Sequence, residues 1–167
     1  LVDTWQIADV EAVDNIVDHR YFASVFPRLA AEGPEVRLFY ETKSNLDRDD
    51  VALLRRAGVR AIQPGIESLS THMLDLMAKG VTALQNAYLL KCCTEYGLAV
   101  YWNILIRIPG EVEEDYRHMV DWMRKMVHLR PPSGGAPRVV GPTEGSEAHA
   151  RAIARACERW DAPAGSL

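Results

Sequence analysis

Carboxylate and amide side chains stand at the ends of, or inside, four short apolar stretches of this chain. Asp14, Glu41 and Glu67 each follow such a stretch, and Asn103 interrupts the fourth. Two carboxylates about 4 Å apart repel each other by roughly 4 kcal/mol at an effective dielectric near 20. Three carboxylates at one place therefore indicate that a cation lies among them and offsets their repulsion. The cation would be either a divalent metal ion or an organic sulfonium or ammonium.

Two further residues belong to the pattern around Glu67. Gly65 has no side chain, so the backbone can approach a ligand closely there. Lys79 stands where a helix is expected to break, in a position to pair with a carboxylate of a ligand. Each residue alone has a plainer explanation, because a carboxylate after a strand often caps a helix or faces water, and most lysines are solvated.

The elements that must position these residues alternate between short apolar runs and amphipathic stretches. Strands are expected at residues 7–14, 36–41, 59–66 and 98–108. Helical spacing of apolar residues predicts helices after each strand, within residues 21–33, 47–58, 74–97 and 113–130. Four βα units in succession imply parallel strands joined by right-handed crossovers. Such folds bind ligands beyond the carboxyl ends of their strands, which is where the polar residues lie.

Local signals refine these boundaries. Asp47 is a suitable N-cap, and Thr82 followed by Gln85 forms a capping box that restarts a helix after a break near Lys79. Pro27 predicts a kink or a late start in the first helix. The stretch 98–108 is apolar almost throughout, so it is expected to be the strongest strand, buried on both faces.

Composition narrows the class of protein. The chain has 167 residues, of which 48% are hydrophobic, enough for one good core, whereas a closed parallel barrel usually takes about 250. The net charge of −4 argues against nucleic acid as a partner. No apolar run approaches the ~20 residues of a membrane helix. The three cysteines form no CxxC pair, so we expect buried thiols in a cytoplasmic protein rather than a zinc site or disulfides.

The central motifs resemble those of one enzyme superfamily. Residues 62–70 (IQPGIESLS) and 76–82 (LMAKGVT) resemble the fourth-strand region of radical S-adenosylmethionine (SAM) enzymes of the cobalamin-associated branch, and residues 96–116 fit the fifth strand and its helix. A narrower resemblance is to the radical SAM C-methyltransferases that mature ribosomally made peptides (RiPPs). It rests on residues 62–70 together with DNI at 14–16, YF at 21–22, LFYE at 38–41 and PPSG at 131–134.

The resemblance covers about residues 7–134 and implies an α/β fold. Residues 1–134 would be a partial TIM-like (β/α)6 radical SAM barrel, made of parallel strands two to five with their helices. Residues 135–167 would be a linker and an Ala-rich helix, a divergent tail. We expect a fragment, because the family's CxxxCxxC loop after the first strand and its upstream cobalamin-binding region are missing from the sequence.

The resemblance also implies roles for the polar residues. Glu67 would accept hydrogen bonds from the ribose hydroxyls of SAM, and Lys79 would meet the methionine carboxylate. Glu41 and Asn103 would complete the polar wall of the site. The charges agree, since SAM carries a sulfonium and an ammonium that suit carboxylates and a carboxylate that suits a lysine.

Other implications are less tied to this wall. Asp14 and Asn15 match the end of the second strand, where the family contacts SAM or substrate, and Arg107 departs from the small or aromatic residue usual there. The implied cofactors are SAM, a [4Fe–4S] cluster in the full-length enzyme, and cobalamin. Because the sequence lacks the three thiolates that hold the cluster, we expect this chain to be inactive alone.

Three functions therefore compete. The first is a portion of a radical SAM enzyme that C-methylates a peptide through a 5′-deoxyadenosyl radical, with the peptide as partner and neither nucleic acid nor membrane. The second is a metal-dependent barrel hydrolase or lyase in which Asp14, Glu41 and Glu67 bind Mg²⁺ or Mn²⁺, although the five histidines are scattered. The third is a non-catalytic remnant that keeps the fold or a partner surface.

Overall fold

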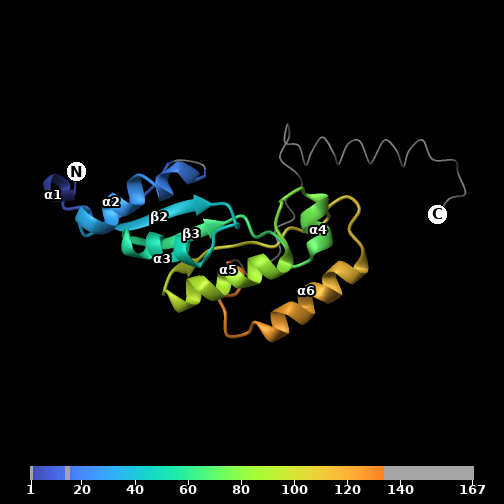
Figure 1. Cartoon of the computed structure of the whole chain (residues 1–167). Coiled ribbons are helices and arrows are strands. Elements are labelled where there is room, and N and C mark those ends of the chain that lie inside the picture. Colours follow the sequence, from blue (N-terminus) through green and yellow to red (C-terminus); the bar gives the residue numbers. More distant parts are fainter. Residues whose placement is uncertain (1, 14–15, 134–167) are drawn as a thin grey trace, which may run out of the picture.

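The fold is built on one parallel sheet (Figure 1). The computed structural model describes residues 2–13 and 16–133. The sheet order follows the chain, and every neighbouring pair of strands is parallel. Its strands are β1 (Asp9–Glu11), β2 (Arg37–Thr42), β3 (Val59–Pro64) and β4 (Ala99–Val100). The predicted α/β class with consecutive parallel strands is confirmed. The tail and its expected helix lie outside the described residues.

Helices follow the strands in the predicted order, and one short helix that was not predicted precedes β1. They are α1 (Val2–Trp5), the 3₁₀ turn η1 (His19–Phe22), α2 (Val25–Glu32), α3 (Arg48–Arg56), α4 (Thr71–Leu76), α5 (Ala83–Glu95) and α6 (Glu113–Lys125). Pro27 is the third residue of α2 and lies within the first turn. Backbone N–H groups of the first turn have no acceptor inside the helix, so the proline, which lacks an N–H, costs no hydrogen bond there. The late start is therefore confirmed rather than the kink. The helices of the described residues are too short or too polar to cross a membrane.

Both predicted caps form. The Asp47 carboxylate accepts a hydrogen bond from the backbone N–H of Asp50 at 2.9 Å, and the Asp50 carboxylate accepts one from the N–H of Asp47 at 3.2 Å. Thr82 and Gln85 exchange the same pair of bonds at the start of α5. These reciprocal bonds satisfy donors that a helix otherwise leaves without partners.

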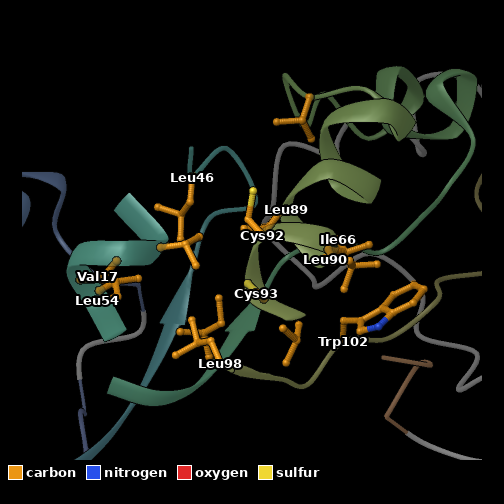
Figure 2. Packing of buried hydrophobic residues seen from close by; sticks show 14 of the residues in the cluster. Val17, Leu46, Leu54, Ile66, Leu89, Leu90, Cys92, Cys93, Leu98 and Trp102 are labelled. Carbon is orange, nitrogen blue, oxygen red and sulfur yellow. The ribbon is translucent and has the colours of Figure 1, made fainter. Parts of the chain in front are cut away.

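The hydrophobic core lies between the sheet and its helices. Ile62 of β3, Leu54 of α3 and Leu90 of α5 are fully buried in it, and Figure 2 shows α5 side chains beside Ile66 and Trp102. Cys92 and Cys93 also lie in this core as free thiols. Burial, with a smaller effect of its neighbour, raises the pKa of Cys93 to about 12. The expectation of buried thiols is confirmed for this pair, and Cys157 lies outside the described residues.

The strand expected at 98–108 is much shorter than predicted. Only Ala99–Val100 forms a regular ladder, followed by a single parallel bridge between Glu67 and Ile104. The path from Ile62 to Glu67 is one residue longer than the facing path from Val100 to Ile104, so the two segments cannot stay in register. That extra residue is a bulge, which interrupts a ladder. Burial on both faces was also wrong, because Tyr101 is 49% exposed.

Helix α4 ends in a Schellman motif that directs the chain into Lys79. The N–H of Ala78 donates to the carbonyl of Asp75, and the N–H of Lys79 donates to that of Leu74, both at 3.0 Å. Ala78 has a φ of +50°, a left-handed conformation in which glycine is usual. The predicted break before Gly80 is therefore confirmed, and an alanine occupies its strained position.

We expect Ala78→Gly to stabilise the protein by about 1 kcal/mol, because glycine adopts this conformation without a steric penalty. Urea unfolding measures the change. Ala52→Gly, in the middle of α3, is the matched control and should cost about 0.5–1 kcal/mol. Equal losses in the two variants would contradict a left-handed residue 78.

Candidate functional site

An ion pair beyond the end of β3 is the centre of the candidate site. The Lys79 ammonium donates to the Glu67 carboxylate. Their side chains are 30% and 26% exposed, so a ligand can reach both. A β-carbon added to Gly65 would lie 3.4 Å from Lys79 Nζ and 3.9 Å from Glu67 Oε1. The pair therefore lies directly over the bare backbone of Gly65, in a space that any side chain there would begin to fill.

The backbone of Glu67 is held in an uncommon conformation. Its φ is +55°, which is left-handed and rare for a residue with a side chain. The carbonyl of Glu67 accepts a hydrogen bond from the N–H of Leu105 at 2.9 Å. This residue is thus part of the bulge described above. Bulges near functional sites re-aim a side chain, and here the carboxylate is aimed at Lys79. The sequence carries no sign of this conformation.

The exposed face of the sheet supplies further polar groups. Glu41 of β2 pairs in register with Gln63 of β3, and both are exposed. Asn103 is also exposed and directly precedes Ile104, the bridge partner of Glu67. On the same face the rings of Phe39 and Tyr101 contact each other, with centroids 6.2 Å apart. The result is an aromatic patch bordered by carboxylate and amide groups.

The predicted site residues are only partly brought into contact. Glu67 and Lys79 meet, whereas Glu41 and Asn103 bond to neither of their side chains in the described residues. Asp14 and Asn15 lie outside the described residues, so the expected cluster of three carboxylates stays a prediction. In residues 2–13 and 16–133, no three His, Cys, Asp or Glu side chains are placed to hold a metal ion.

A buried aspartate fixes the loop that follows Glu67. Asp115 at the start of α6 accepts hydrogen bonds from Ser70 Oγ at 2.5 Å and from the backbone N–H of Val112 at 2.9 Å. Nδ1 of His72 lies 3.0 Å from the same carboxylate. Burial by itself raises the pKa of Asp115, but the bonds from Ser70, Val112 and His72 together outweigh it and hold that pKa below its usual value. The network joins the first turns of α4 and α6.

The lowered pKa of Asp115 predicts how stability depends on pH. A depressed carboxyl pKa contributes stability that is present above the unfolded value and is lost as pH falls through the folded one. We expect the stability advantage of the native protein over Asp115→Asn to shrink progressively as pH falls below about 5. Urea unfolding across this range measures it. Asp121→Asn, on the exposed side of α6, should follow the native profile. A pH-independent difference for Asp115→Asn would contradict the lowered pKa.

Known proteins resemble most of the described chain in sequence or in fold. The uncharacterized methyltransferase PH0819 of Pyrococcus horikoshii is 23% identical over 123 residues, which are 72% of this chain and 27% of that protein. The radical SAM methyltransferase TsrM of Kitasatospora setae, solved with tryptophan substrate and the SAM analogue aza-SAM, aligns over 74% of this chain and 26% of its own, with 20% identity and a TM-score of 0.60. The cobalamin-dependent SAM radical enzyme OxsB was solved with aqua-cobalamin. It aligns over 83% of this chain and 22% of its own, with 12% identity and a TM-score of 0.63.

This chain therefore spans about a quarter of the length of these relatives. At such identities the solved structures establish the fold. The family follows from the sequence, because the profile of the Radical SAM superfamily matches residues 9–123. That range runs from β1 to α6 and includes Glu67 and Lys79. The chain belongs to the radical SAM superfamily.

Proposed function

We propose that this chain supplies part of the SAM-binding wall of a radical SAM methyltransferase. The observation that carries the proposal is the Glu67–Lys79 pair over Gly65. SAM ends in an amino acid group with one ammonium and one carboxylate, beside a sulfonium and two ribose hydroxyls. A carboxylate next to an ammonium complements these groups. Glu67 would accept hydrogen bonds from the ribose hydroxyls, and Lys79 would pair with the methionine carboxylate.

The exposed sheet face would form the rest of the wall. Glu41 and Asn103 lie on this face or at its end, beside the aromatic patch of Phe39 and Tyr101. They would contact the polar parts of SAM or of the substrate. Asp14 and Asn15 remain proposed contacts on the grounds of their sequence alone.

For the whole enzyme, we propose C-methylation of a peptide in RiPP maturation in the cytoplasm. Support comes from the sequence resemblance and from TsrM, a methyltransferase solved with tryptophan and, in another structure, with cobalamin and a [4Fe–4S] cluster. In such an enzyme regions other than this chain would hold a [4Fe–4S] cluster, which would supply the reducing electron, and cobalamin, which would supply the methyl-carrying centre. The missing barrel and cobalamin-binding regions would be the partners of this chain.

The residues that the structure describes do not fit an iron–sulfur cluster. Such clusters need cysteine thiolates converging on one point, and the sequence has no CxxxCxxC motif. Cys92 and Cys93 are adjacent on α5 and buried in the apolar core, where burial disfavours the thiolate of Cys93. We therefore assign no step to the cluster here and propose that the chain is inactive alone.

Calorimetric titration with SAM tests the proposed wall. We expect the native chain to bind SAM, and Glu67→Gln and Lys79→Met each to weaken binding about tenfold or more, because each removes one charged hydrogen bond, worth about 1.5–3 kcal/mol. Gly65→Ala should also weaken binding, because its methyl group enters the space over which the ion pair lies. Glu113→Gln, which removes a surface ion pair on α6, is the matched control and should bind like the native chain.

The same titration separates the competing functions. Binding of Mn²⁺ that is lost in Glu67→Gln, without binding of SAM, would favour the metal-dependent hydrolase or lyase. Binding of neither would favour the non-catalytic remnant. SAM affinity unchanged by all three site variants would place the ligand elsewhere and contradict the proposed wall.

Anaerobic reconstitution with iron and sulfide tests the second part of the proposal. We expect no stoichiometric cluster, and hence no absorbance band near 400 nm after gel filtration, because the required thiolates are missing. A band that persists in a Cys92→Ser, Cys93→Ser double variant would show adventitious iron. A stoichiometric cluster lost in that double variant would contradict inactivity of the chain alone.

A further inference from the structure

The conformation of Glu67 requires an external constraint. A left-handed residue with a side chain costs about 1–2 kcal/mol, and such strain persists where the surroundings over-determine it. The carbonyls of Ile66, Glu67 and Ser68 are all hydrogen-bonded. The N–H of Leu105 donates to the middle one, and the N–H of Ser68 donates to that of Ile66 at 2.6 Å. A single side chain, that of Asn86, donates to the carbonyls of both Ile66 and Ser68.

Asn86 is a polar residue at a core position. It lies on the buried side of α5 and has no solvent exposure. Its Nδ2 donates to the carbonyls of Ile66 and Ser68, each at 3.0 Å. Its Oδ1 is buried and without a hydrogen-bond partner, which costs about 1–3 kcal/mol. A side chain that served stability alone would not need to leave an acceptor unpaired in the core.

The amide of Asn86 suits this task for a geometric reason. An NH₂ group has two hydrogens in one plane, so one nitrogen can donate to two carbonyls at once. The two carbonyls are those of the residues on either side of Glu67. The Ile66 carbonyl belongs to the peptide group before Glu67, and the Ser68 carbonyl belongs to the peptide group after Ser68. Holding both fixes the two ends of the short segment that contains Glu67, and so restricts the direction of its carboxylate toward Lys79.

We propose that Asn86 is a positioning residue for SAM binding: it clamps the carbonyls on either side of Glu67 and so keeps this residue left-handed, with its carboxylate at Lys79. The effect of Asn86 on SAM binding rests on the proposed function, whereas its hydrogen bonds to the carbonyls of Ile66 and Ser68 do not. Asn86 itself does not touch the ligand and acts through Glu67.

The geometric part is tested without any ligand. In the native chain Glu67 should show the strong intraresidue Hα–HN nuclear Overhauser effect of a positive φ. Asn86→Leu keeps the branched shape and the number of side-chain heavy atoms, removes both donors and removes the unpaired oxygen, so we expect a folded protein in which that signal is lost. Asn86→Ser, which retains one donor, is the second variant should the leucine variant not fold. Leu90→Met, a buried change on the same helix, should keep the signal.

The functional part is tested by a double-mutant cycle in SAM affinity. We expect Asn86→Leu to weaken binding about tenfold in the native background and to have no further effect in a Glu67→Ala background. An equal loss in both backgrounds would show a merely structural role and overturn the proposal. So would a positive-φ signal of Glu67 that survives in both Asn86 variants. Absence of SAM binding by the native chain would overturn the proposed function, while the signal of Glu67 would still decide whether Asn86 clamps it.

Discussion

The site depends on one backbone constraint, the bulge at the end of β3. The extra residue between Ile62 and Glu67 breaks the ladder with the following segment and leaves Glu67 left-handed. Without it, strict alternation would continue along the strand and would dictate the face to which residue 67 points. With it, the Glu67 carboxylate turns to a lysine that arrives from the end of α4. The polar end of this barrel segment is therefore set by a local irregularity of the parallel sheet.

The buried polar groups near this bulge are organised around it. Asn86 of α5 holds the carbonyls beside Glu67, and Asp115 of α6 holds Ser70 a few residues further on. Both come from helices that follow in sequence, so these bonds to the loop form when α5 and α6 pack against it. Buried polar bonds of this kind are costly to leave incomplete. They fix one loop conformation where apolar packing alone would permit several.

The sequence predicted what depends on local signals and missed what depends on register. Helix boundaries at Asp47 and Thr82 followed from capping residues, and the parallel order followed from the alternation of apolar runs. The strand at 98–108 was overestimated because apolar composition cannot reveal a bulge in the strand beside it. The left-handed Glu67 was also invisible, since no glycine marks it. Asn86 could have been found, because it is the one amide among the alanines, leucines and cysteines that line the apolar side of α5.

The structure also changes the electrostatic argument for the site. Three clustered carboxylates would call for a cation, but in the described residues Glu67 already has one, the Lys79 ammonium. The pair is formally neutral, which suits a zwitterionic group better than a bare divalent ion. Ion pairs with this much exposure contribute only about 0–1 kcal/mol, so a ligand can take over either partner at little cost. A ligand that offers a carboxylate to Lys79 and hydroxyl donors to Glu67 replaces the interactions of both partners, and SAM carries both kinds of group.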